Sequence, residues 1–261
     1  MSVESIWRAQ SNEQIAEDVF EIRLYSEDAT PFSAVQPGQF MHLRVANAPQ
    51  LLLRRPISLH DWDAAAQTVT LQYAVVGEGT KALAAIKTGD LLPALAPIGR
   101  GFPLEPSFKK VWLLGGALGT APLFPIAKAL SDAEIHAYLG WKTAAQATVL
   151  DRWRAATQLH LYTDDGTVGE KGFALDGVLH ALASGERPDV IYACGPEAMY
   201  RAMAARLPED IPCYVSLETR MACGIGACLV CNCKVNTPAG EAHQRVCVDG
   251  PVFPLREVVF S

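Results

Sequence analysis

Hydrophobic and polar positions along the chain follow two different periods. Up to about Gly101, short segments such as 40–45 and 68–75 alternate apolar with polar residues, and turn signals such as Pro37-Gly38 and Gly77-Glu78-Gly79 separate them. Alternation of this kind is typical of strands with one buried face. The first hundred residues are therefore predicted to form a small antiparallel β-barrel.

From about Lys110 the pattern changes to short apolar runs, each followed by a segment of helical length. Strands that alternate with helices predict a parallel α/β sheet. The Gly- and Pro-rich stretch 97–103 is the expected boundary. We expect three regions, and their ranges are 1–101 for the barrel, 102–213 for the α/β domain and 214–261 for a short tail that carries most of the cysteines. Helical segments are expected at 121–130, at 175–182 and through Met199 and Met203.

Composition narrows the class of protein. The chain has 261 residues, of which 50% are hydrophobic and 19% charged, and this balance predicts a folded protein. A formal net charge of −6 without a basic run argues against nucleic-acid binding. No apolar stretch approaches the ~18–20 residues of a membrane span, and the first residues lack a signal-peptide pattern, so we expect a cytoplasmic protein that binds no membrane. Seven cysteines without an export signal favour metal ligation or free thiols over disulfides.

The cysteines near the end of the chain carry the most specific signal. Cys223, Cys228 and Cys231 have the spacing C-x4-C-x2-C, and Cys247 follows. This is the spacing of plant-type [2Fe–2S] ligation, although four cysteines could also hold a structural zinc ion. Glycines within the loop suit tight wrapping around a cluster, because glycine enters left-handed conformations at little cost. Cys233 breaks the spacing and is assigned no role.

Two segments of the barrel region could hold a nucleotide. In Arg55-Pro56-Ile57-Ser58, the arginine could pair with a pyrophosphate and the serine could bond to a flavin ring nitrogen; a surface turn is the alternative. Further on, Gly79-Thr80 precede a short helix expected over 81–86, whose first N–H groups could hold a phosphate. An ordinary loop-to-helix cap would explain the same residues.

Two glycine-containing turns in the α/β region could hold a dinucleotide. The first contains Gly115, Gly116 and Gly119 and continues into Ala121-Pro122, and the second is Cys194-Gly195-Pro196. Both follow predicted strands, and ligands of parallel sheets bind at the carboxyl ends of strands. The first turn is not the G-x-G-x-x-G fingerprint, so a plain tight turn remains an alternative, and Cys194 could be a buried inert thiol. No hydrolytic arrangement of side chains is found.

Together these motifs resemble the ferredoxin–NADP reductase superfamily and, within it, the family of electron-transfer subunits of NAD-dependent dihydroorotate dehydrogenases. The most specific resemblance lies in residues 163–166, 221–228 and 245–253. It implies a ferredoxin-reductase-like FAD-binding barrel, a parallel-sheet NAD-binding domain and a [2Fe–2S] loop. The implied FAD contacts are Arg55, Pro56, Ile57, Ser58, Gln72, Tyr73, Ala74, Gly79 and Thr80; the implied NAD contacts are Gly115, Gly116, Gly119, Ala121, Pro122, Cys194, Gly195 and Pro196; and the implied cluster ligands are Cys223, Cys228, Cys231 and Cys247.

This resemblance also implies a function. A nicotinamide exchanges two electrons as hydride and an iron–sulfur cluster takes one at a time, so a flavin is needed between them. No catalytic side chain is then expected, and Ser58 would lie near flavin N5. The implied partner is the FMN-containing catalytic subunit that oxidises dihydroorotate in pyrimidine biosynthesis, with two of each subunit in a heterotetramer. Apolar residues beside the cysteines are candidates for that contact or for core packing, namely Ile225, Leu229, Val230 and Phe253.

Other functions fit the same motifs. Within redox chemistry, the chain could be the flavin and iron–sulfur subunit of a sulfide dehydrogenase or of an NADH-dependent ferredoxin:NADP transhydrogenase. Outside it, the chain could be a zinc-stabilised nucleotide-binding regulatory protein.

Overall fold

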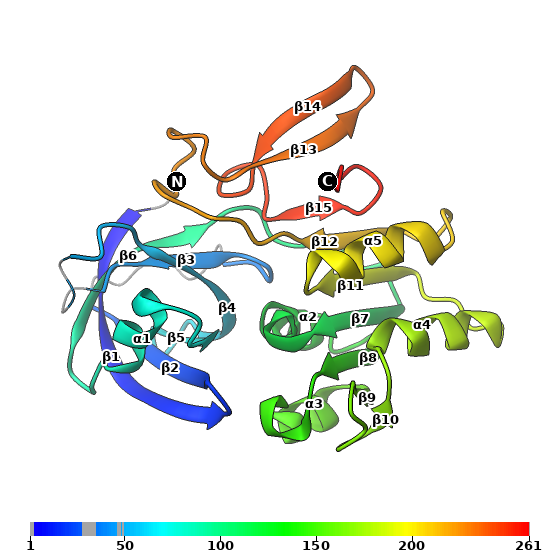
Figure 1. The fold of residues 1–261 in the computed structure, drawn as a ribbon, viewed down its shortest axis with the longest axis horizontal. Helices are drawn as coiled ribbons and strands as arrows, with labels where there is room; N and C mark the ends of the chain where they lie inside the picture. Colours follow the sequence, from blue (N-terminus) through cyan, green and yellow to red (C-terminus); the bar gives the residue numbers. More distant parts are fainter. Residues whose placement is uncertain (1–2, 28–34, 46–47, 49, 261) are drawn as a thin grey trace.

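A computed structural model describes residues 3–27, 35–45, 48 and 50–260. Within these ranges, six antiparallel strands close a barrel in the order β1-β2-β5-β4-β3-β6 (Figure 1). The strands are β1 (Val3–Ala16), β2 (Val19–Ser26), β3 (Phe40–Leu43), β4 (Arg55–Asp63), β5 (Thr68–Ala74) and β6 (Leu91–Ile98), and α1 (Glu78–Ala84) lies between β5 and β6. The predicted barrel is therefore confirmed.

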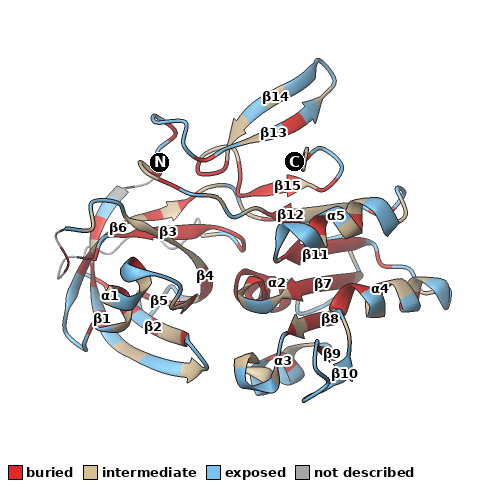
Figure 2. Cartoon of the chain, viewed as in Figure 1, coloured by how far each residue is buried: buried red, intermediate tan, exposed pale blue. Residues whose placement is uncertain are grey.

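Strand β3 is buried on both of its faces. Met41 and Leu43 point into the barrel core, where burial of each side chain stabilises the fold by about 1.5–3 kcal/mol. Because successive side chains alternate, Phe40 and His42 point out of the barrel. Both are nevertheless buried, since later parts of the chain cover them (Figure 2). The outer face of β3 is therefore a contact surface for the rest of the molecule.

The second half of the chain forms a seven-stranded sheet in the order β10-β9-β8-β7-β11-β12-β15. All neighbouring strands are parallel except β15, which is antiparallel to β12. The strands are β7 (Lys110–Gly116), β8 (Glu134–Trp141), β9 (Gln158–Thr163), β10 (Glu170–Lys171), β11 (Val190–Cys194), β12 (Cys213–Ser216) and β15 (Val252–Pro254). The predicted parallel α/β sheet is confirmed.

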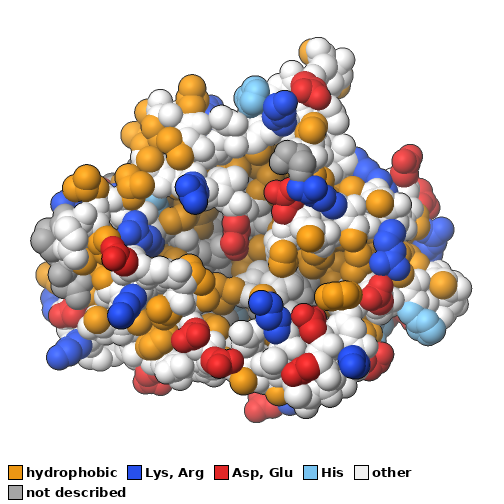
Figure 3. Space-filling view, in the orientation of Figure 1, with side chains coloured by type: hydrophobic (Ala, Val, Ile, Leu, Met, Phe, Trp, Pro, Cys, Tyr) orange, Lys and Arg blue, Asp and Glu red, His pale blue; other side chains and the backbone are white. Residues whose placement is uncertain are grey.

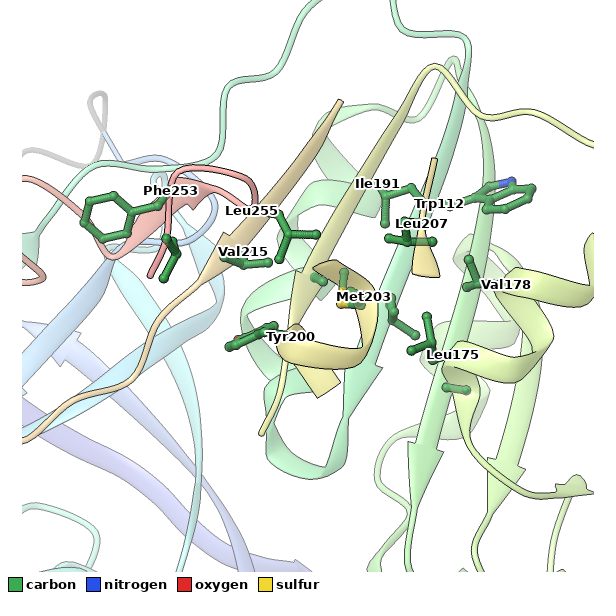
Figure 4. Close-up of a cluster of buried hydrophobic side chains, with 14 of the residues drawn as sticks. Trp112, Leu175, Val178, Ile191, Tyr200, Met203, Leu207, Val215, Phe253 and Leu255 are labelled. Carbon is green, nitrogen blue, oxygen red and sulfur yellow. The ribbon is translucent and has the colours of Figure 1, made fainter. Parts of the chain in front are cut away.

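Helices cover both faces of this sheet, so its central strands are apolar throughout. In β7, Trp112 and Leu114 pack on one face, while Val111 and Leu113 pack on the other. Figure 4 shows the face that carries α4 and α5, where Met203 and Leu207 meet the sheet. The helices are α2 (Phe124–Ala129), α3 (Leu150–Ala156), α4 (Ala174–Ala183) and α5 (Glu197–Arg206), with the 3₁₀ helices η2 (Ala117–Leu123) and η3 (Ala144–Gln146).

The segment that carries the cysteine cluster packs onto both halves of the molecule. It forms the hairpin β13 (Asn232–Thr237) and β14 (Gly240–Arg245), which projects beyond the sheet (Figure 1). It then returns through β15, whose Phe253 lies in the same core as the helices α4 and α5 (Figure 4). Strands β12 and β15 thus join the α/β sheet to the cysteine segment.

Two helices differ from the expectation at their boundaries. Helix α1 begins at Glu78, three residues before the predicted start, because Thr80 Oγ1 accepts hydrogen bonds from the N–H groups of Val76 and Gly77. The stretch predicted as one helix over 121–130 is divided into η2 and α2. Ala117 has a positive φ of 50° at the start of η2, and the chain winds more tightly there. In the part of the chain that the structure describes, no helix is long and apolar enough to cross a membrane.

Candidate functional site

A cavity of about 390 Å³ lies between the barrel and the α/β half, and Figure 3 shows the surface hollowed there. The expected FAD residues of β4 and β5 line it from the barrel side, and Ala121 and Pro122 of η2 line it from the other side. Its barrel wall contains Arg55, Pro56, Ile57, Ser58, Gln72, Tyr73, Ala74 and Thr80. Segments far apart in the sequence therefore form one site between two domains, as expected for a flavin that faces a nicotinamide.

Arg55 and Gly79 are in direct contact. The guanidinium of Arg55 lies over residue 79, so closely that a Cβ there would overlap with Nε, Cζ and Nη2. Glycine leaves room for the guanidinium in this position, and a larger residue would displace the Arg55 side chain. The arrangement places a fixed positive charge beside the first N–H groups of a helix, and such a combination suits a phosphate or pyrophosphate.

Within the described part of the chain, two buried polar atoms of the cavity lack hydrogen-bond partners. Gln72 Oε1 and Thr219 Oγ1 are buried, and neither has a hydrogen-bond partner among the described residues. Both residues line the cavity. A buried polar atom without a partner costs about 1–3 kcal/mol, so these positions fit a ligand with polar groups along one edge, such as a flavin ring.

Glu218 belongs to no motif of the sequence but is part of the site. It lies on the segment after β12, lines the same cavity and is accessible from it. Desolvation by the surrounding protein raises the pKa of its carboxyl above the usual range. The only sequence signal is its place after an apolar strand, at the edge of the sheet where ligands bind.

A second cavity of about 320 Å³ lies at the carboxyl ends of β7 and β8. Gly115, Gly116 and Pro196 line it, as does Phe173, whose side chain is 65% exposed and offers an aromatic face to a base. Charged groups also surround this cavity, and they are Lys142, Asp164, Asp176 and Arg206. Part of the expected NAD set therefore lies at this second cavity and part at the first.

Three of the expected NAD residues, Gly119, Cys194 and Gly195, line neither cavity. A Cβ at Gly119 would overlap with the carbonyl oxygen of Cys194 and lie 2.7 Å from the nitrogen of Gly195. Gly119 is thus needed for close packing of η2 against the turn after β11. The Cys194 thiol is buried, lies 3.7 Å from the Ser216 carbonyl oxygen, and has a pKa raised far above its ordinary value by burial. Its environment is that of an inert packed thiol.

The four cysteines expected as cluster ligands lie close together, in two pairs. The N–H of Cys228 is 3.4 Å from Cys223 Sγ, and the thiols of these two residues interact. Cys231 and Cys247 form the second pair, and both are buried. The N–H of Val246 donates to the carbonyl of Cys231 at 2.9 Å, which holds the two chain segments together. A [2Fe–2S] cluster takes two cysteines at each iron, and the pairing fits this requirement.

Backbone groups of the loop are directed at Cys223. Burial alone would raise the pKa of the Cys223 thiol, but N–H groups of Ile225, Cys228 and Ala227 outweigh it and bring the pKa to about 6. Such a loop stabilises negative charge on sulfur, as ligation of iron requires. In the pair deeper in the protein, burial and the neighbouring Cys231 thiol raise the pKa of Cys247 to about 12.

The cysteine segment also contains a fifth thiol, Cys233, which lies outside the two pairs. Cys233 is half-buried in β13, and burial raises the pKa of its thiol to about 11. Among the described residues, no three His, Cys, Asp or Glu side chains are grouped closely enough to hold a single metal ion, and the four cysteines lie as two pairs.

The surface of the loop is apolar. Ile225, Leu229 and Val230 are 57%, 60% and 52% exposed. Phe253, the fourth candidate for contact with a partner, is instead buried in the core at 3% exposure, because β15 pairs with β12. The apolar rim therefore consists of residues on the cysteine loop itself.

Comparisons with known proteins agree with this geometry. Residues 218–259 match the family described as the iron–sulfur cluster binding domain of dihydroorotate dehydrogenase B. The dihydroorotate dehydrogenase B (NAD(+)) electron transfer subunit of Geobacillus kaustophilus is 41% identical over 254 residues, which cover 95% of this chain and 96% of that protein. The subunit of the same name from Shouchella clausii is 38% identical over 250 residues, which cover 94% of each chain.

Solved structures with the same fold include an NADH-dependent reduced ferredoxin-NADP oxidoreductase, with a TM-score of 0.85 and 28% identity over 97% of this chain and 89% of the other. Phthalate dioxygenase reductase shares the fold at a TM-score of 0.64 and 19% identity, over 93% of this chain and 76% of the other. The identity to the curated relatives extends through barrel, sheet and cysteine loop. The chain therefore belongs to the family of electron transfer subunits of dihydroorotate dehydrogenase B.

Proposed function

We propose that this chain is the oxidoreductase subunit that passes electrons from a catalytic partner to NAD⁺ through a [2Fe–2S] cluster and FAD, in the oxidation of dihydroorotate for pyrimidine biosynthesis. The observation that carries the proposal is the succession of three sites in one chain: a dinucleotide cavity, an interdomain cavity and a loop with two pairs of thiols. When bound, FAD exchanges hydride with NAD(H) and single electrons with the cluster.

The side chains of the interdomain cavity bind and orient the flavin. Arg55, held over Gly79, neutralises the pyrophosphate, and its fixed fork favours two parallel hydrogen bonds. Ser58 lies on the same strand and lines the cavity near the expected position of flavin N5. Gln72 Oε1 and Thr219 Oγ1, which have no hydrogen-bond partner among the described residues, would bond to polar atoms of the flavin. These residues position the ring and exclude water, and none of them needs to exchange a proton.

In this proposal the three regions have separate tasks. Residues 1–101 bind FAD, residues 102–213 bind NAD(H), and residues 214–261 hold the cluster through Cys223, Cys228, Cys231 and Cys247. Gly115, Gly116 and Pro196 border the cavity proposed for NAD(H), and Phe173 would offer its ring to the adenine. Gly119, Cys194 and Gly195 support that site through backbone packing.

We further propose that the partner is an FMN-containing catalytic subunit, and that two copies of each chain form a heterotetramer. The name of the relatives, an electron transfer subunit, implies a second subunit. The exposed apolar residues Ile225, Leu229 and Val230 surround the loop that holds the cluster, so a partner bound there would receive or deliver electrons over a short distance.

Joint purification with the catalytic subunit tests this proposal. The two chains should elute as one complex of two copies each, and the complex should reduce NAD⁺ with dihydroorotate. Leu229→Glu together with Val230→Glu should abolish the complex and leave the FAD and iron content unchanged. Persistence of the complex in this double variant would exclude the apolar rim as the contact.

A second candidate is the corresponding subunit of an NADH-dependent ferredoxin-NADP oxidoreductase, because a solved structure of that kind has a TM-score of 0.85 with this chain. The two functions differ in the partner. Reaction with ferredoxin and NADP⁺, and no reaction with dihydroorotate, would favour the second candidate.

A further inference from the structure

A buried histidine of the barrel lies against the cysteine loop. His42 belongs to β3, points out of the barrel and is 0% exposed. Neither Nδ1 nor Nε2 has a hydrogen-bond partner among the described residues. Burial of an imidazole nitrogen without a hydrogen-bond partner destabilises a fold. The ring is therefore expected to have a partner that belongs to the assembled protein.

The contact is with the residue next to Cys223. Gly224 has a positive φ of 70°, and a Cβ there would overlap with Nδ1 of His42 and lie 3.2 Å from Cε1. Glycine is needed at this position both for its conformation and for the close approach of the ring. Nδ1 is thus the ring nitrogen that faces the cysteine loop.

On its other side, His42 adjoins the expected flavin strand. Its partner across the ladder is Pro56 in β4, and the next outward residue of β3, Phe40, lines the interdomain cavity. Burial and the positive charges of Arg54 and Arg55 together lower the pKa of His42 to about 4, although a weak hydrogen-bonding approach of the ring to the Arg54 backbone opposes them. The ring has an N–H donor in either protonation state.

We propose that Nδ1–H of His42 donates a hydrogen bond to a sulfur of the bound [2Fe–2S] cluster, either the thiolate of Cys223 or a bridging sulfide. This inference rests on the proposed function, because it requires the cluster. His42 is then a positioning residue that holds the cluster loop against the flavin strand. A donor to sulfur stabilises the added electron, so it also raises the reduction potential of the cluster.

The test is a redox titration of the purified chain, followed by the electron paramagnetic resonance signal of the reduced cluster. His42→Leu removes the N–H donor and keeps a similar side-chain volume, whereas His42→Gln restores an N–H donor. The control is His243→Gln, which removes an exposed histidine from strand β14 of the cysteine segment. At the solution potential where the wild type is half reduced, His42→Leu should lower the ratio of reduced to oxidised cluster about tenfold, which is about 59 mV for one electron. His42→Gln should recover most of this change, and His243→Gln should show none.

A second measurement is made on the wild type, and one variant serves only to assign its signal. Wild-type protein with ¹⁵N only in the imidazole rings should show a weak nitrogen coupling to the reduced cluster in pulsed spectra, and His42→Gln should lack it. An unchanged potential in His42→Leu, or no imidazole coupling in the wild type, would overturn the assignment to the cluster. Loss of FAD from His42→Leu with an unchanged potential would overturn it as well, because the ring would then serve the flavin.

Failure of the proposed function gives a different result. Iron, sulfide and FAD are measured in every sample. Wild-type protein that contains zinc, or no iron and sulfide, would contradict the proposed function, whereas an intact cluster that is insensitive to residue 42 contradicts only the inference about His42.

Discussion

At the level of single residues, the two neighbouring arginines Arg54 and Arg55 have different roles at the flavin cavity. Arg55 is held in place by its position over Gly79 and by hydrogen bonds to the carbonyls of Leu53 and Arg54. A guanidinium fixed in this way loses little conformational entropy when it binds a pyrophosphate. Its neighbour Arg54 instead pairs with Glu4 and does not line the cavity.

This division leads to a first prediction. Arg55→Ala should weaken FAD binding at least tenfold, since it removes a charge-assisted pair of hydrogen bonds, and Arg55→Lys should recover only part of the affinity. Arg54→Ala is the matched control and should retain full FAD content. Flavin fluorescence after dilution of the purified variants measures the dissociation constant. Full affinity in Arg55→Ala would show that the pyrophosphate binds elsewhere.

The cysteines allow a second prediction at this scale. Cys231→Ser should remove the cluster, because Cys231 is buried in a pair with Cys247. Cys233→Ser should keep about two irons per chain, since Cys233 lies outside both pairs. Iron and acid-labile sulfide content and the visible spectrum distinguish the variants. A cluster that survives Cys231→Ser but not Cys233→Ser would reverse the assignment.

At the scale of elements, η2 and the turn after β11 depend on each other. The motif residues 115–122 suggested a glycine turn through which a dinucleotide reaches the backbone, but the structure gives Gly119 a different role. It allows η2 to pack on the backbone of Cys194 and Gly195. A single sequence does not reveal such a contact, because the two segments are about 75 residues apart and neither contains a local pattern that predicts its contact with the other.

Other elements were predictable in proportion to the strength of their local pattern. The alternation in β5 and the apolar run of β7 locate these strands almost to the residue. In β7 the apolar run reflects burial on both faces, whereas in β5 the polar residues Thr68 and Gln72 are buried as well, which the alternation does not predict. The start of α1 and the division at Ala117 depend on particular hydrogen bonds and on one positive φ, which propensity does not encode. The roles of Glu218 and His42 could not be predicted from the sequence. An isolated acidic residue or histidine forms no motif, and its role depends on the segments that pack around it in the fold.

A third prediction concerns the packing of η2. Gly119→Ala should lower the free energy of unfolding by about 1–3 kcal/mol, because the added methyl overlaps with the Cys194 carbonyl and the backbone must shift. Reduction by NADH should slow while FAD stays bound. Gly77→Ala is the control: its backbone is extended and a Cβ there meets nothing within 4 Å, so its stability should match that of the wild type. Urea unfolding measures the free energy of unfolding, and stopped-flow spectroscopy measures the rate of reduction by NADH. If Gly119→Ala matched the wild type in both quantities, the packing role of Gly119 would be contradicted.

At the scale of the whole molecule, side-chain contacts join the barrel to the α/β half behind the flavin cavity. Arg152 of α3 binds both oxygens of Glu21 in β2, at 2.7 and 2.9 Å, and Gln72 donates to the same carboxylate at 2.9 Å. His60 Nδ1 lies 3.1 Å from the Ala121 carbonyl oxygen. Glu21 thus links a helix of the NAD(H) half to a residue of the flavin cavity.

A fourth prediction follows from the charge of Glu21. Burial would raise the pKa of its carboxyl, but hydrogen bonds from Arg152 and Gln72 outweigh burial, so the pKa is lowered. A carboxyl with a lowered pKa stabilises the folded state above its unfolded pKa, and this contribution is lost as pH falls through the folded value. Glu21→Gln should therefore destabilise the protein by about 1 kcal/mol at pH 7, where the partly exposed pair is screened by solvent.

The measurement is urea unfolding of wild type and variant between neutral and acidic pH. The difference should shrink as pH falls below about 4, near the ordinary value for Glu. Glu209→Gln, at an exposed site after α5, is the control and should leave stability unchanged. A difference that stays constant with pH would mean that packing, and not the charge of Glu21, joins the two halves.

One spectrum shows whether this chain carries electrons between NAD(H), FAD and a [2Fe–2S] cluster. The chain is purified without oxygen, its iron, sulfide and flavin are measured, and its visible spectrum is followed during addition of NADH. The account predicts about two irons and one FAD per chain, flavin bands with a cluster shoulder, and bleaching of both by NADH. A colourless chain with one zinc ion, or flavin and cluster bands that NADH leaves unchanged, would contradict it.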